Sequence, residues 1–296
     1  MFLPKLQFLK RDEIDDKSWD DVIENSSLCR IYAYTWYLDA MTKANWSGLI
    51  IGDYEFVMPV YSKKKLFLPY VTQPFLSQQL GIFGYLKDLT PEIEFQFIYF
   101  LKTHYVKTDI LVHSKLSSNY NHEIKQNHIL PLRFPYLELK DKYNRNTLRN
   151  IKEPQKQGLN LTENTDNLEF YSFLEKTDKT GLVQKYGSNI KRLIATTYLK
   201  KNQLIISTKD NHGVNAAAYL IFDKTRIYFL LCASNKIGIE NKSMFLIIDY
   251  IIEKYAEKFD TLDFTGSNID SIARRNLGFG AQIENYYHYK FGIGFW

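Results

Sequence analysis

The chain has 296 residues, a formal net charge of +5, 45% hydrophobic residues and 16% aromatic residues. This composition excludes a disordered protein, and the length predicts two domains of roughly 100–150 residues, because a single core rarely extends further. No apolar run reaches the roughly 18 residues of a membrane-spanning helix, so no membrane span is expected.

Cysteine and histidine are sparse, which limits the redox and metal chemistry that the chain can support. Cys29 and Cys232 both lie in apolar surroundings, and the six histidines are scattered. We therefore expect two reduced thiols rather than a disulfide, and no metal site. Residues 1–13 lack the apolar stretch of a secretory signal. These features predict a cytoplasmic protein, with its oligomeric state open between monomer and homodimer.

The first half is predicted to contain three strands, a long loop, a helix and a further strand. The three strands are expected at Ser47–Ile51, Tyr54–Tyr61 and Leu66–Val71. A loop over residues 72–90 leads to a helix over Pro91–Tyr105, with Thr90 as its N-cap and Pro91 at the first helical position. Asp109–Val112 is then expected to be a short buried strand.

Two segments concentrate positive charge. The lysines at positions 63–65 are predicted to be solvated charges at a hairpin turn. Further on, four basic residues follow the spacing that stacks side chains on one helix face. They are Arg145, Arg149, Lys152 and Lys156. Pro154 is expected to break or kink that helix near Glu153. The basic face is either simply solvated or a surface that binds phosphates or other anions.

The second half repeats the order of elements. A new strand is expected at Leu132–Leu139. Three more strands, a helix and two strands are then expected at Gln203–Thr208, Gly213–Phe222, Arg226–Ala233, Ser243–Lys258, Thr261–Phe264 and Gln282–Phe291. Antiparallel strands followed by a strand–helix–strand crossover imply a mixed sheet in each half. The sequence thus predicts an α+β protein with a domain over residues 1–130 and another over residues 131–296.

The C-terminal part combines strand, turn and helix signals with polar side chains. Asp263-Phe264-Thr265-Gly266-Ser267 is predicted to place Asp263 and Ser267 at the carboxyl end of a strand, where open α/β sheets tend to place ligands. Ile272-Ala273-Arg274 and Phe279-Gly280-Ala281 follow it, in a short basic helix and a glycine turn.

These motifs resemble the closing signature of the FemAB-like, tandem-GNAT group of acyltransferases. Tyr143, Arg145, Asn150 and Ile151 are similar to that group's segment after the inter-domain strand. Gln73-Pro74-Phe75 and Gln78-Gln79-Leu80-Gly81 look like a first-domain motif of bacterial relatives. The resemblance covers most of residues 15–296 and implies two tandem GNAT-like domains, each with a mixed sheet flanked by helices.

The resemblance also implies transfer of an acyl group from acetyl-CoA or another acyl-CoA to an amine on a small molecule or peptide. In GNAT proteins the donor lies along one strand and at the loop and helix N-terminus after it. Here the implied donor-binding residues are Leu231, Cys232, Ala233, Asn235, Lys236, Gly238, Asn241, Lys242 and Ser243. The loop keeps only part of the usual glycine-rich pattern, and Glu240 would repel an anion. Ser243 is expected to cap the helix that follows.

The residue types near the predicted sheet opening suit acyl transfer to an amine, which needs a base, oxyanion donors and an acid. Asp263 is the candidate base, although it could instead only stabilise the turn or pair with Arg274. Tyr286 is a candidate acid, and Ser267 could donate to the acyl oxygen or cap the turn. Arg274 could hold a carboxylate or phosphate of the substrate.

The glutamine-rich loop is the other candidate for substrate binding. Gln73, Gln78 and Gln79 beside Phe75 combine amides with an aromatic wall, as small-molecule pockets do, or they satisfy the backbone of their own loop. Two alternatives to acyl-CoA chemistry remain open. One is a binding protein that kept the fold without activity, and the other is a transferase that uses aminoacyl-tRNA to modify cell-wall precursors.

Overall fold

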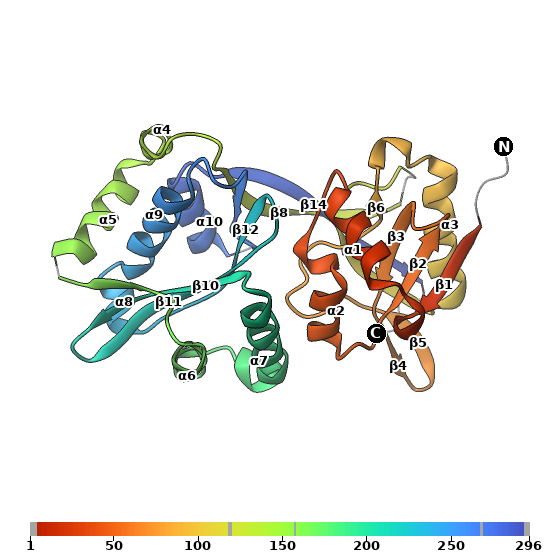
Figure 1. Cartoon of the computed structure of the whole chain (residues 1–296), viewed down its shortest axis with the longest axis horizontal. Helices are drawn as coiled ribbons and strands as arrows, with labels where there is room; N and C mark the ends of the chain where they lie inside the picture. The colour runs from red at the N-terminus through yellow and green to blue at the C-terminus, as the bar shows by residue number, and fades with distance from the viewer. Residues whose placement is uncertain (1–4, 118–119, 157, 267–268, 293–296) are drawn as a thin grey trace. The chain divides into compact units, whose positions relative to one another are not determined.

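The computed structural model describes residues 5–117, 120–156, 158–266 and 269–292. The chain forms two compact units; in Figure 1 the first is coloured from red to yellow and also includes the blue C-terminal strand, and the second is coloured from yellow-green to blue. The first unit comprises Met1–Lys125 and Asn285–Trp296, and the second comprises Gln126–Glu284. The final strand from Asn285 onward therefore belongs to the first unit, whereas the sequence placed it in the second half. A division into folding domains at residues 130 and 131 stays a prediction.

The strands of the first unit pair in two groups. In the first group, β1 (Leu6–Lys10), β2 (Ser47–Ile51), β3 (Phe56–Val60) and β6 (Phe83–Gly84) are all antiparallel neighbours. In the second group, β4 (Ser62–Lys65) pairs antiparallel with β5 (Leu68–Val71), β5 pairs parallel with β7 (Lys107–Val112), and β7 pairs antiparallel with β14 (Gln282–Gly292). The single mixed sheet expected for this half is thus divided between two sets of paired strands.

The helices of the first unit cover these strands and complete its core. They are α1 (Asp16–Asn25), α2 (Thr35–Thr42) and α3 (Pro91–His104), with short 3-10 turns at Arg11–Glu13, Ile31–Ala33 and Leu86–Asp88. The predicted N-cap of α3 is confirmed, because the side chain of Thr90 accepts a hydrogen bond from the amide of Ile93. Phe97 and Leu101 of α3 are fully buried against Val112 and Tyr289 of the strands.

The second unit contains a mixed sheet, as expected. Its strands are β8 (His122–Pro131), β9 (Asn160–Glu163), β10 (Gln203–Asp210), β11 (Gly213–Phe222), β12 (Arg226–Ser234) and β13 (Thr261–Asp263). They are ordered β8-β13-β12-β11-β10-β9, and only β12 and β13 pair in parallel. The crossover between those two strands passes through a helix, as parallel strands require.

Helices cover both faces of this sheet (Figure 1). They are α4 (Tyr136–Lys140), α5 (Arg145–Lys156), α6 (Asn167–Thr177), α7 (Leu182–Lys200), α8 (Lys236–Glu240), α9 (Ser243–Tyr255) and α10 (Asp270–Gly278). Figure 1 shows α5 and α9 on one face and α6 and α7 on the other. Ile248 and Ile252 of α9 pack with Leu220 of β11 in the core. The expected α+β fold, with sheet and helices in each unit, is confirmed.

Two local predictions are wrong for reasons that involve proline. The segment Leu132–Leu139 is not a strand, because β8 already ends at Pro131 and α4 begins after Pro135. Of the break or kink expected near Glu153, the break is wrong, since α5 continues to Lys156 with Pro154 inside it, and the kink stays a prediction. A proline near the end of a helix removes only one backbone hydrogen bond there, and the amide of Leu159 closes the last turn onto the carbonyl of Pro154.

Candidate functional site

In the sheet of the second unit, β12 extends beyond the end of its parallel neighbour β13, and the pairing of the two strands stops there. The two strands pair only from Arg226–Tyr228 to Thr261–Asp263 among the described residues. One further contact joins them, in which the hydroxyl of Thr265 donates to the carbonyl of Phe229 at 2.6 Å. Beyond that point β12 continues to Ser234 without a neighbour from β13. Among the described residues, the backbone groups on that side of β12 therefore have no partner from β13.

Two irregularities occur at the same level of the sheet. In the register of β11 and β12, Tyr219 pairs with Leu231 and Leu220 pairs with Phe229, so that Leu230 is an extra residue in β12. Such a bulge bends its strand and is common beside active sites. Across the opening, Thr265 has φ of 52°, a left-handed conformation that is unusual for a β-branched residue. Strain of this kind concentrates at binding and catalytic sites.

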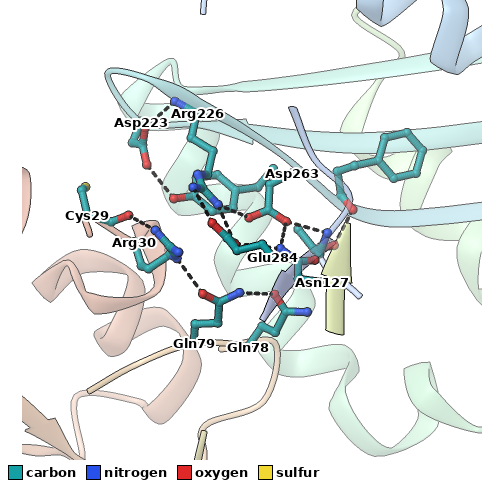
Figure 2. A network of polar contacts seen from close by, with 12 residues as sticks. Cys29, Arg30, Gln78, Gln79, Asn127, Asp223, Arg226, Asp263 and Glu284 are labelled. Carbon is teal, nitrogen blue, oxygen red and sulfur yellow. Dashed lines mark hydrogen bonds and ion pairs between the residues drawn. The ribbon is translucent and has the colours of Figure 1, made fainter. Parts of the chain in front are cut away.

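A buried cluster of charged side chains supports the end of β13 (Figure 2). The Arg226 guanidinium donates to Asp263 Oδ2 at 2.8 Å and to both carboxylate oxygens of Glu284 at 3.1 Å. The Asn127 amide donates to Asp263 Oδ1 at 2.9 Å and to Glu284 at 3.3 Å. Burial by itself lowers the pKa of Arg226, but the negative charge of Asp263, with Tyr228 and Glu284, raises it overall.

The environment of Asp263 favours a positioning role. Its side chain is 0% exposed, and the backbone amide of Thr265 also donates to Oδ1, at 2.8 Å. Three donors therefore occupy the two oxygens, from Asn127, Thr265 and Arg226. A carboxylate that is this well paired stays in place and holds the turn after β13. This is the alternative that the sequence left open for Asp263, with Arg226 as the partner instead of Arg274. Its role as a base stays a prediction.

The candidate donor-binding residues of β12 differ in exposure. Leu231 is buried, Ala233 is half-buried and Cys232 is exposed. The thiol of Cys232 interacts with the guanidinium of Arg275 from α10. Although the residue as a whole is exposed, desolvation of the thiol raises the pKa of Cys232, and Arg275 opposes part of that rise. Cys232 can thus serve as a chemical reporter on this part of β12.

The predicted donor loop contains a short helix that the sequence did not indicate. The side chain of Asn235 caps α8 by accepting from the amide of Gly238 at 2.8 Å. Gly238 lies against β11 so closely that a Cβ atom would be 2.2 Å from the carbonyl oxygen of Asn215. Lys236 is largely exposed, 3.9 Å from Glu240. Asn235 and Gly238 therefore have local structural roles, and their contact with a donor stays a prediction.

Helix α9 begins differently from what was expected. Lys242 is its N-cap, with φ of 59°, and no side chain caps the helix there. Ser243 is the first helical residue and is 0% exposed, and its hydroxyl has no hydrogen-bond partner among the described residues. The prediction that Ser243 is the N-cap of α9 is wrong, because the N-cap is the preceding residue, Lys242. The consequence is a helix N-terminus without a side-chain cap, at which the amide of Phe245 bonds to the carbonyl of Lys242 and the exposed Lys242 side chain supplies positive charge.

The candidate glutamines of the first unit form hydrogen bonds within the loop and with residues outside it. The side chain of Gln73 accepts from the amide of Leu111 at 3.1 Å and donates to the carbonyl of Ser77 at 2.6 Å. Gln79 is 0% exposed, accepts from Arg30 at 2.8 Å and donates to Gln78 at 3.1 Å. Figure 2 shows the chain of contacts from Arg30 to Gln78. The contacts with Ser77 and Gln78 match the alternative in which the amides satisfy their own loop, whereas Leu111 and Arg30 tie the loop to other segments of the unit.

The remaining candidates are dispersed. Tyr286 lies in β14 and belongs, with Gln73, Phe75, Gln78 and Gln79, to the first unit, whereas Asp263 and Arg274 belong to the second. Arg274 is exposed on α10 and contacts the carbonyl of Asp270 at 3.4 Å. Ser267 lies outside the described residues. A pocket that joins residues from both halves stays a prediction, as do the catalytic roles of Tyr286 and Ser267.

Sequence reasoning missed Arg226, Asn127 and Glu284. They come from β12, β8 and β14, up to 157 positions apart, so no local motif connects them. One signal was present, because a charged residue that opens an otherwise apolar strand, as Arg226 does, needs a buried partner. Within the described ranges, no group of three or more His, Cys, Asp and Glu side chains is arranged to hold a metal ion. In the same ranges, no helix has both the length and the apolar character to cross a membrane.

Comparison with known proteins identifies the fold. No family model matches the sequence, and no curated protein matches it significantly. The structure is similar to FemX, with 12% identity, a TM-score of 0.66 and coverage of 95% of this chain and 96% of that chain. The chain has the tandem GNAT fold.

Two further solved structures agree. A tandem GNAT protein from the clavulanic acid biosynthesis pathway has 8% identity, a TM-score of 0.56 and coverage of 97% and 98% of the two chains. L-PGS from Bacillus licheniformis has 11% identity, a TM-score of 0.56 and coverage of 93% and 91%. The resemblance to the FemAB-like, tandem-GNAT group is thus confirmed at the level of the fold.

Proposed function

We propose that the second unit binds acyl-CoA or a related activated donor along the open part of β12 and transfers the acyl group to an amine. The divergence of β12 and β13, in a chain with the tandem GNAT fold, carries this proposal. Fold alone does not establish an activity, but here the opening coincides with a bulge in β12 and a strained residue after β13. The FemAB-like resemblance and the open strand edge point to the same ligand position.

The residues around the opening offer suitable contacts for each part of such a donor. The backbone of Leu231–Ala233 can pair with the amides of the pantetheine arm. The uncapped N-terminus of α9 can bind the pyrophosphate, aided by the charge of Lys242. Lys236 can contribute further positive charge, although Glu240 offsets it. Cys232, on the same strand, then lies beside the bound donor.

The reaction would proceed by direct attack. The amine nitrogen forms a bond to the acyl carbonyl carbon, the carbon–sulfur bond breaks, and the departing thiolate takes a proton while the amine loses one. We propose Tyr286 as the acid, Ser267 as a donor to the acyl oxygen and Arg274 as a contact for the acceptor. Gln73, Gln78, Gln79 and Phe75 remain candidates for the acceptor's pocket.

Protection of Cys232 from alkylation tests where the donor binds. Acetyl-CoA should slow the reaction of Cys232 with iodoacetamide, while Cys29, which lies in the first unit, keeps its rate and serves as the control in the same molecule. Lys242→Glu should weaken binding of acetyl-CoA in isothermal titration, whereas Lys224→Glu, in the turn before β12, should not. Unchanged alkylation of Cys232 at saturating acetyl-CoA would place the donor elsewhere. No detectable binding would favour the non-catalytic protein or another donor.

Asp263→Asn separates the two roles of that residue. If Asp263 is the base, the variant loses activity and keeps its melting temperature. If Asp263 positions β13, the side-chain amide of the variant has two orientations, and both lose hydrogen bonds. In one, its N–H groups face the donors of Arg226; in the other, they face the donors of Asn127 and Thr265. The melting temperature should therefore fall. A changed pH profile of kcat in a variant of normal stability would support the base. A lower melting temperature with an unchanged profile would support the positioning role.

A second candidate function is transfer from aminoacyl-tRNA. It is favoured by the basic side chains that α5 exposes along one face from its start to its end, because such a face can bind the phosphates of an RNA. These residues are Arg145, Arg149, Lys152 and Lys156. Binding of tRNA that weakens with salt and with Arg145→Glu/Arg149→Glu would support this function. Equal binding by that variant would exclude α5 as the tRNA surface.

A further inference from the structure

The turn between β4 and β5 exposes apolar side chains at a conformational cost. Lys65 pairs with Leu68, so Leu66 and Phe67 form a two-residue turn. Their φ angles are 50° and 66°, both left-handed, as a type I′ turn requires. Such turns normally use Asn-Gly, because bulky residues are strained in this conformation. Leu-Phe is therefore an unfavourable choice for the turn itself, which suggests that these side chains serve another purpose.

The tip of this hairpin is unusually exposed. Phe67 is 95% exposed, more than any other large hydrophobic residue that the structure describes, and Leu66 is 74% exposed. Leu68, the next residue, is 44% exposed. Figure 1 shows the hairpin of β4 and β5 projecting from its unit. Isolated exposed hydrophobic residues are ordinary, but three in succession at a projecting tip form a contact surface.

Positive charge surrounds this apolar tip. Lys63, Lys64 and Lys65 precede it directly, and the segment 61–71 contains no acidic residue. All three lysines are exposed, as the burial pattern of β4 shows. Lys65 also lines a hollow of about 180 Å³ together with Leu68 and Lys107. Lys107 is 3.8 Å from Asp109.

We propose that the tip of this hairpin, Leu66–Leu68 with Lys63–Lys65, docks on the surface of a membrane that contains anionic lipids. Leu66 and Phe67 would enter the boundary between headgroups and acyl chains, and the lysines would stay among the headgroups. This inference is independent of the acyl-transfer proposal. It needs no membrane-spanning helix, because interfacial binding uses only apolar area and electrostatic attraction.

A lipid surface fits this tip better than a protein does. A stable protein interface buries about 800 Å² on each partner, whereas the tip offers three apolar side chains on a narrow projection. Pairing of two copies through β4 is opposed by its three lysines, since like charges on an edge strand discourage edge-to-edge association. A fluid surface with negative charge can accept a narrow apolar tip without a preformed groove.

Co-sedimentation with vesicles tests the proposal. The wild type should bind vesicles of phosphatidylcholine with phosphatidylglycerol, should bind pure phosphatidylcholine more weakly, and should lose affinity as salt rises. Leu66→Asn/Phe67→Gly should lower the affinity at least about tenfold. The same variant supplies the preferred residues of the turn, so its melting temperature should stay equal or rise, which separates lost binding from lost folding.

Matched variants isolate each part of the tip. Tyr198→Gln/Leu199→Asn removes two exposed apolar side chains from α7, 64% and 79% exposed, and should leave vesicle binding unchanged. Lys63→Gln/Lys64→Gln/Lys65→Gln should remove the preference for anionic vesicles. In Phe67→Trp, the fluorescence of the new tryptophan should shift to the blue on binding.

Several results would overturn the proposal. They are equal binding of neutral and anionic vesicles, unchanged binding by the Leu66→Asn/Phe67→Gly variant, and no binding by the wild type. Dimers that dissociate in that variant, in sedimentation experiments without vesicles and without any lipid binding, would show that the tip contacts a second copy of the chain.

Discussion

Removal of Arg226 should destabilise the second unit strongly. Its side chain is only 13% exposed and neutralises Asp263, which is 0% exposed, and Glu284, which is 18% exposed. Arg226→Leu keeps an apolar stem but leaves two carboxylates without their counter-ion. Removing one partner of a buried ion pair typically costs about 3–5 kcal/mol, because the remaining charge stays desolvated. We expect a loss in that range for the free energy of unfolding of this unit.

The assay must follow the second unit. All four tryptophans lie outside residues 126–284, so their fluorescence reports the first unit. Urea unfolding by far-ultraviolet circular dichroism, with hydrogen exchange of peptides from β12 and β13, should detect the loss. Arg226→Leu should speed the exchange of the amides at Tyr228 and Thr265 most, because they lie beside the cluster.

A matched control tests the role of burial. Arg133 donates two hydrogen bonds to Asp260, at 2.8 and 2.7 Å, much as Arg226 donates to both oxygens of Glu284, but the side chain of Arg133 is 70% exposed. Arg133→Leu should therefore change stability far less, because solvent screens an exposed pair. Equal losses in Arg226→Leu and Arg133→Leu would refute the argument from burial. A double-mutant cycle with Asp263→Asn should show coupling between Arg226 and Asp263.

Three further predictions address single residues. Burial raises the pKa of Asp249, although Tyr136 and Lys140 oppose the rise. The stability of the wild type should therefore fall as pH rises above about 3.9 and through the folded-state pKa, because the buried carboxyl group loses its proton there. The melting temperature of Asp249→Asn should vary less with pH, and parallel curves for the variant and the wild type would contradict this. Gly238→Ala should lose about 1–3 kcal/mol in urea unfolding, since its Cβ would meet a backbone carbonyl, and wild-type stability would contradict that contact. Because burial raises the pKa of Cys232, its alkylation at pH 7 should be slower than that of glutathione and should accelerate at alkaline pH; a rate equal to glutathione would count against this.

Much of the fold could be predicted because local patterns were clear. The bounds of β2 and β11 agree with the sequence prediction, since β2 ends before the glycine turn at Gly52 and β11 begins at Gly213. The N-cap of α3 was also readable, because Thr90 and Pro91 act through their immediate neighbours. The division of the first unit's strands into two groups could not be read in this way, because pairing partners are set by tertiary contacts.

The position and the composition of the candidate site rest on different signals in the sequence. The end of β13 was identified because a turn signal follows polar residues on an apolar strand. The partners of Asp263 were not, since Asn127 and Arg226 are 136 and 37 positions away in sequence. The segment before α9 was expected to be a loop, but it contains α8, which Gly238 allows to pack closely on β11. Close packing of that kind leaves no periodic signal in the sequence.

These contacts change how the motif at residues 263–266 is understood. Its polar residues first suggested proton transfer, yet Asp263 binds three donors and the hydroxyl of Thr265 binds the carbonyl of Phe229. Both interactions fix the point at which β13 leaves β12. If the open strand binds the donor, the motif contributes to function by setting where the opening begins. Substitutions in it should then alter donor affinity and stability together, whereas the loss of a proton-transfer group would lower kcat alone.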